Sequence, residues 1–107
     1  MGGRVIVVDT VIRRLAGQVA VHVATAQGID LQFIYRAALG IYWDPVEALL
    51  EDRSEAVDSA QTSAARIARA LREEYGISLQ ASGNVRWEGF IADDRDQVAQ
   101  TLFAQAR

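Results

Sequence analysis

The fold class is decided by residues 54–75, which read SEAVDSAQTSAARIARALREEY. Ser54 can cap the start of a helix there, and Gly76 is the residue type that commonly ends one. Apolar residues recur in this stretch at the three- and four-residue spacing of an amphipathic helix: Val57, Ala60, Ala64, Ile67, Leu71 and Tyr75. The pattern therefore predicts one long helix with a single buried face.

The chain after this helix predicts strands and a second helix. Residues 77–80 (Ile-Ser-Leu-Gln) can form a short strand, and 82–84 (Ser-Gly-Asn) are typical of a turn. Residues 85–91 have apolar side chains at positions 85, 87 and 91, as a strand does, with a glycine irregularity at Gly89. Asp93 can cap a final helix that runs to about Ala106.

The chain before the long helix contains two aromatic runs. Residues 31–36 (LQFIYR) and 41–43 (IYW) are rich in aromatic and branched side chains, which favour extended structure. Asp44-Pro45 is a turn dipeptide, and 48–52 can return as the second arm of a hairpin. We therefore predict an extended region over 31–52.

Residues 5–27 allow two interpretations. As a helix over about 9–27, they place one apolar stripe at Val8, Val11, Ile12, Leu15, Val19, Val23 and Ala26. As strands, 5–8 and 19–23 are β-branched, and Gly17-Gln18 is a turn between them. We favour the helix because Asp9 and Gly28 are suitable caps for it.

These elements combine into one α+β domain over residues 1–107. Half of the residues are apolar, which is typical of a globular domain. Helix, hairpin, long helix, strand and helix follow one another. We therefore predict a small antiparallel sheet with the helices packed on one of its faces.

Composition excludes several classes of chemistry. The chain has no cysteine and no lysine, so thiolate metal sites, disulfides, thiol nucleophiles and Schiff bases are excluded. A single histidine excludes multi-histidine metal sites, and a net charge of −3 makes a nucleic-acid partner unexpected. We expect no cofactor, no metal and no membrane segment, and a cytoplasmic location.

His22 is the first candidate for chemistry because it is the only histidine. A histidine can act as a general base near neutral pH, and an enzyme would use His22 with a carboxylate such as Asp44. No neighbour in the sequence supplies an orienting acid. We therefore expect His22 to be a packed residue whose replacement changes stability alone, and we keep the enzyme as the alternative.

The stronger candidate is an aromatic and arginine-containing surface. Tyr35, Arg36, Tyr42, Trp43 and Asp44 lie close together in the sequence. Tyrosine, tryptophan and arginine dominate binding hot spots. In an extended segment Tyr42 and Trp43 point to opposite faces, so one of them faces outward. We therefore expect a ligand- or partner-binding surface at this segment, and a homodimer.

The segments Phe33-Ile-Tyr-Arg and Gly40-Ile-Tyr-Trp-Asp-Pro, followed by the long helix and Val85-Arg-Trp, carry a resemblance. Over this span the chain resembles small uncharacterised α+β proteins encoded by bacterial mobile (integron-type) gene cassettes. The resemblance implies a non-enzymatic binding or accessory module, with an immunity- or antitoxin-like role as one version. It transfers no catalytic residue to this chain.

Overall fold

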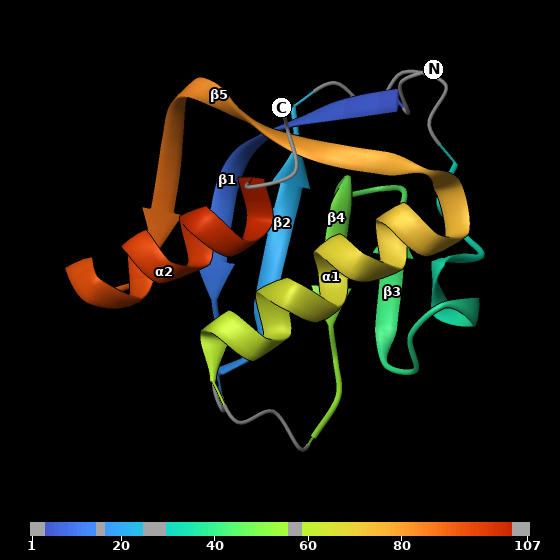
Figure 1. Ribbon diagram of the computed structural model, residues 1–107, viewed down its shortest axis with the longest axis horizontal. Helices are drawn as coiled ribbons and strands as arrows, with labels where there is room; N and C mark the ends of the chain where they lie inside the picture. The colour runs from blue at the N-terminus through green and yellow to red at the C-terminus, as the bar shows by residue number, and fades with distance from the viewer. Residues whose placement is uncertain (1–3, 15–16, 25–29, 56–58, 104–107) are drawn as a thin grey trace.

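The computed structural model describes residues 4–14, 17–24, 30–55 and 59–103 (Figure 1). Its elements are β1 (Arg4–Arg13), β2 (Val19–Val23), the 3₁₀ turn η2 (Ile34–Arg36), β3 (Ile41–Asp44), β4 (Leu49–Asp52), α1 (Ala60–Tyr75), β5 (Ile77–Glu88) and α2 (Ala92–Phe103). The strands form one sheet in the order β3-β4-β2-β1-β5. No helix within these ranges is long and apolar enough to cross a membrane.

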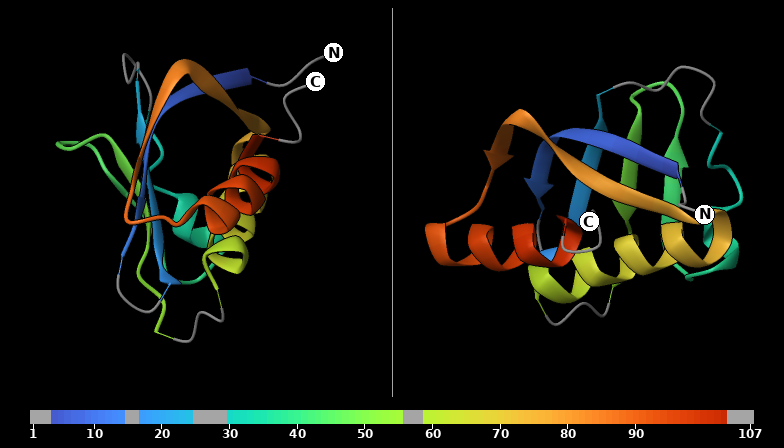
Figure 2. Two further views of the ribbon diagram at one scale, coloured as in Figure 1. Left: turned by 90° about the vertical axis from the view of Figure 1, so that its left-hand side faces the viewer. Right: turned by 45° about the horizontal axis from the view of Figure 1, so that its top comes forward.

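Both helices pack on the same face of the sheet, which confirms the predicted α+β class (Figure 2). The predicted antiparallel sheet is wrong at one edge: the sheet is mixed, since β5 runs parallel to β1 while the other neighbours are antiparallel. Parallel strands arise here because α1 carries the chain back along the sheet between β4 and β5, as a crossover helix does. The core lies between the sheet and the helices.

The favoured helix over residues 9–27 is wrong, and the strand interpretation is correct for the part that the structure describes. β1 and β2 form an antiparallel pair, with a β-bulge in β1 between Val8 and Thr10. The bulge inserts one residue, so the buried side chains of β1 are Ile6, Val8 and Val11. The three-residue step from Val8 to Val11 reproduces the spacing of a helix. Residues 15–16 and 25–29 lie outside the described ranges.

The expected extended run over 31–36 is also wrong, because the chain turns there and forms η2. Leu31 and Ile34 are both fully buried, and their spacing of three matches one helical turn. The carboxylate of Asp30 accepts a hydrogen bond from the Gln32 N–H at 3.1 Å, which stabilises the start of the turn.

The β3–β4 hairpin and the helix α1 are confirmed, although α1 starts later than predicted. Ser59 caps the helix, since its Oγ accepts a hydrogen bond from the Thr62 N–H at 3.1 Å. The expected cap Ser54 instead donates its N–H and hydroxyl to Asp52. The helix ends at Gly76, whose φ of 65° is left-handed as predicted for a terminal glycine. Val57 lies outside the described residues.

The predicted turn at 82–84 lies inside a single long strand, where β5 bends (Figure 1). Pairing of β5 with β1 skips from Ala81, opposite Val8, to Arg86, opposite Thr10. Residues 82–85 therefore stand opposite the one bulged residue of β1. Two irregularities, the bulge and the bend, thus occur side by side in neighbouring strands.

Candidate functional site: the open face of the sheet

The face of the sheet opposite α1 and α2 carries polar and charged side chains, and we call it the open face. Because side chains alternate along strands, the paired residues of neighbouring strands form rows across it. One row crosses all five strands: Asp44, Leu49, His22, Thr10 and Arg86. The strands thus bring together groups that are far apart in the sequence.

The bulge in β1 places an acid beside the histidine. The bulged residue is Asp9, and its Oδ1 lies 2.7 Å from Nδ1 of His22. The side chain of His22 is 38% exposed and that of Asp9 36%. Bulges commonly re-aim a side chain beside an active or binding site. Here the bulge turns the Asp9 carboxylate toward the imidazole, which fixes the orientation of the ring.

A groove of about 440 Å³ lies over this pair. Its lining combines apolar side chains, hydrogen-bonding side chains and charged groups: Asp9, Thr10, Ile12, His22, Glu47, Leu49, Asn84 and Arg86. The bend in β5 contributes Asn84, so both strand irregularities border the same groove. The lining residues lie on four strands and in the β3–β4 turn, so the groove forms only when these strands pair in the folded sheet.

A second charged cluster on the open face is centred on Glu51. Its carboxylate contacts the guanidinium groups of Arg14 and Arg53, the latter at 2.8 Å, and its side chain is 8% exposed. Burial raises the pKa of Glu51, but the hydrogen bonds and charges of Arg53 and Arg14 outweigh it, and the pKa falls below its ordinary value of 4.5. Glu51 raises the pKa of Arg53 in turn. Both groups are therefore held in their charged forms.

The residues of the predicted binding surface are divided by the structure. Tyr42 lies on the open face, where the Arg53 guanidinium stacks 5.0 Å from its ring centroid. Trp43 lies on the opposite face and packs against the core, as the predicted alternation requires. Asp44 ends β3 on the open face, and its Oδ1 accepts hydrogen bonds from the backbone of the following turn.

Tyr35 and Arg36 lie on η2, which packs against α1 and β3 on the helix side of the sheet, away from the face that carries Tyr42 and Asp44. Arg36 stacks 5.3 Å from the Phe33 ring centroid, and its Nε lies 3.8 Å from a carboxylate oxygen of Glu74 on α1. The single surface expected over residues 35–44 is therefore not formed. The aromatic–arginine contact of the open face uses Arg53, which sequence analysis did not single out.

The structure also changes the partner of His22. Leu49 stands between His22 and Asp44 in the row, so these two residues are separated by two strand spacings, about 10 Å. The orienting acid is Asp9, which is thirteen residues away in the sequence. The expectation of a packed histidine is wrong in this respect, because the imidazole lines the groove.

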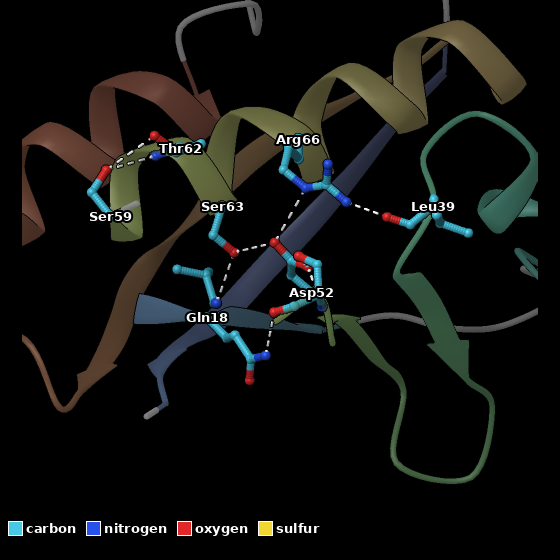
Figure 3. Close-up of polar contacts among 9 residues, drawn as sticks. Gln18, Leu39, Asp52, Ser59, Thr62, Ser63 and Arg66 are labelled. Carbon is cyan, nitrogen blue, oxygen red and sulfur yellow. Dashed lines mark hydrogen bonds and ion pairs between the residues drawn. The ribbon is translucent and has the colours of Figure 1, made fainter. Parts of the chain in front are cut away.

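A contrasting polar cluster lies on the helix side of the sheet, around Asp52 (Figure 3). Ser63 of α1 donates a hydrogen bond to Oδ2 of Asp52 at 2.8 Å, and its own Oγ accepts the Val19 N–H at 2.9 Å. The Ser54 N–H donates to Oδ1 at 2.9 Å. The side chain of Asp52 is fully buried. The cluster therefore ties β2, β4 and α1 together.

Arg66 closes this cluster from the side of α1. Its Nε lies 3.4 Å from Oδ2 of Asp52, and its guanidinium donates to the Leu39 carbonyl oxygen (Figure 3). Arg69 on the same helix is exposed instead and pairs with Glu73 at 3.0 Å. The protein itself occupies the Asp52 oxygens, and this cluster is structural.

Comparisons with protein-family models, with curated proteins and with solved structures returned no match. Within the described ranges, no three histidine or acidic side chains gather as a metal-binding group would. The groove on the open face is the candidate site of this protein.

Proposed function

We propose that this protein is a non-enzymatic binding module that takes a small organic molecule into the groove on the open face. The observation that carries the proposal is the Asp9–His22 pair, set at 2.7 Å by a bulge in β1 and lining the groove. An irregular strand beside convergent polar groups is a feature of binding and active sites.

The size and lining of the groove favour a small molecule. Ligand sites commonly span about 300–1,000 Å³ and combine apolar contacts with a few placed polar groups. The groove, at about 440 Å³, offers Ile12 and Leu49 for apolar contact. Thr10, His22 and Asn84 offer hydrogen bonds. The sequence predicted a binding surface at residues 35–44, whereas this proposal places the binding site in the middle of the sheet.

The proposal is tested by screening a fragment library with two-dimensional NMR of the ¹⁵N-labelled protein. We expect fragments to shift the amides of residues 9–12, 22 and 84–86, and His22→Ala to weaken their binding at least tenfold. Arg69→Ala, on the exposed side of α1, is the matched control and leaves binding unchanged. Shifts scattered over the helices, or equal binding to His22→Ala, would refute the proposal.

The Asp9–His22 pair also supports a second candidate, an enzyme with His22 as general base. The carboxylate engages Nδ1, and no side chain of the described ranges hydrogen-bonds Nε2. Thr10 stands directly opposite His22 in the row. A histidine oriented in this way can take a proton from water or from a bound substrate.

This candidate is tested with nitrophenyl esters and phosphates as substrates. Catalysis by His22 requires a hydrolysis rate above that of His22→Ala, and a lower rate in Asp9→Asn, where the ring loses its charged partner. Equal rates in all three proteins would leave the binding module as the function.

Assembly is a separate matter, and the expected homodimer stays a prediction. Light scattering during size-exclusion chromatography measures the mass directly. A mass near 23 kDa, twice the 11.7 kDa of one chain, would support the dimer, and a mass near 11.7 kDa would refute it.

A further inference from the structure

The charged groups of the groove are arranged in order across the sheet. Glu47 lies at one end, in the turn between β3 and β4, and Arg86 lies at the other end, on β5. The strand order places β2 and β1 between them. Glu47 therefore marks one end of the groove and Arg86 the other, and the Asp9 carboxylate, paired with His22, lies on β1 between them.

The middle of the groove offers hydrogen bonds and apolar surface. His22 and Thr10 stand opposite one another on β2 and β1, and Ile12 and Leu49 lie beside them. Apart from His22, the two carboxylates and one guanidinium of the lining give a net charge of −1. A complementary ligand therefore carries a positive group for Glu47 as well as a negative group for Arg86.

Arg86 is available to a ligand although it has an ion-pair partner. Its Nη2 lies 3.5 Å from Glu88, and both side chains are exposed, so this pair contributes little. A guanidinium has five N–H donors and binds a carboxylate best through two of them at once. A ligand carboxylate can thus engage the Arg86 donors that face the groove, where Asn84 adds an amide.

We propose that the ligand is a dipeptide-sized zwitterion, with its carboxylate at Arg86, its peptide group over His22 and Thr10, and its ammonium at Glu47. This inference rests on the proposed binding function. β4 and β5 are three strand spacings apart, about 14 Å. Two extended residues span about 7 Å, which leaves the remainder to the Glu47 and Arg86 side chains that reach in from the two ends.

The experiment measures dissociation constants by NMR titration for L-leucyl-L-leucine, its N-acetyl derivative, its C-terminal amide, and free L-leucine. The apolar leucine side chains suit Ile12 and Leu49. Because a hydrogen bond to a charged group contributes more than a neutral one, we expect blocking either end of the dipeptide to weaken binding about tenfold. Free leucine, which cannot reach both ends, is expected to bind at least tenfold more weakly.

Two variants assign the ends separately. Arg86→Gln should abolish the preference for the free acid over the amide and retain the preference for the free amine. Glu47→Gln should do the reverse. Arg69→Gln on α1 is the matched control and should retain both preferences.

The outcomes separate this inference from the proposed function. If fragments bind the groove but the four probes bind equally, or if Arg86→Gln keeps the acid preference, the zwitterion is overturned while the binding module stands. If leucine binds as tightly as the dipeptide, the dipeptide size is overturned. If neither fragments nor probes shift the groove residues, both proposals fail.

Discussion

Two carboxylates on opposite sides of the same sheet show how differently one chemical group can be used. Asp52 is fully buried, and hydroxyl, backbone N–H and guanidinium groups of the protein surround it. Asp9 is more than one-third exposed, and His22 is its one hydrogen-bond partner among the described residues. The hydrogen-bonding capacity of Asp52 is used entirely within the protein. Asp9 instead orients the ring of His22, which lines a groove open to solvent.

The difference teaches which polar clusters indicate function. A buried carboxylate must be fully satisfied, because an unpaired buried charge is costly, and such clusters hold elements together. A half-exposed pair contributes little to stability. When a strand is bulged to form such a pair, stability alone does not account for the bulge. The two sites should therefore respond to mutation in opposite ways.

The largest effect is expected for Asp52→Ala. Removing the carboxylate leaves the buried Ser63 hydroxyl without its acceptor, and it takes the buried charge partner from Arg66, whose side chain is 34% exposed. Breaking a buried pair in this way costs about 3–5 kcal/mol of unfolding free energy, measured by urea denaturation. Glu73→Gln, which breaks the exposed pair with Arg69, is the control and should cost less than about 0.5 kcal/mol. Equal losses would show that the Asp52 cluster is not structural.

A smaller loss is expected for Ser63→Ala on α1. Its hydroxyl both donates to Asp52 and accepts the buried Val19 N–H, so the variant leaves two groups without this partner. We expect a loss of about 1–3 kcal/mol in the same denaturation assay. Thr62→Ala tests the neighbouring, exposed side chain of the helix and should cost less. A loss for Ser63→Ala no greater than that for Thr62→Ala would contradict the assignment.

These structural elements were the more predictable ones. Residues 60–75 have a regular helical stripe and end at Gly76, so local pattern and tertiary packing agree. The hairpin around Asp44-Pro45 follows from turn chemistry. The start of α1 was misplaced because Ser54 and Ser59 are both suitable caps, and Asp52, a tertiary partner, takes the first of them.

Glu51 links stability to pH on the open face. Its pKa is lowered in the folded protein, so the folded state binds fewer protons than the unfolded state around pH 4. Its stabilisation is therefore complete above the ordinary pKa of 4.5 and is lost as the pH falls through the lower, folded value. We expect Glu51→Gln to cost about 1 kcal/mol at pH 7, and this difference to shrink below pH 4.5. If the difference in unfolding free energy between Glu51→Gln and the unchanged protein were constant between pH 7 and pH 3, the stabilising role of the Glu51 carboxylate would be contradicted.

The bulge in β1 that forms the candidate site is also the reason why the sequence pattern did not predict the site. A bulge shifts the alternation of a strand by one residue, so the buried residues Val8 and Val11 matched a helix. In that interpretation Asp9 was a cap and its contact with His22 could not be foreseen. Alternation alone did place Tyr42 and Trp43 on opposite faces correctly. The side-chain alternation of a regular strand can thus be predicted from the sequence. The prediction fails at a bulge, where the pairing skips a residue.

The smallest effect on stability, and the decisive one for function, is expected for His22→Ala. The imidazole is 38% exposed and its pair with Asp9 is open to solvent, so the unfolding free energy should change by less than about 0.5 kcal/mol. Ligand binding should nevertheless weaken at least tenfold, because the oriented ring donor or acceptor is lost from the middle of the groove. Asp9→Asn should keep the stability too and weaken binding less, since the ring stays but its orientation is held by a neutral amide. A large loss of stability in His22→Ala would instead place this pair with Asp52 among the groups that hold the fold together, and the bulge in β1 would then need no ligand to explain it.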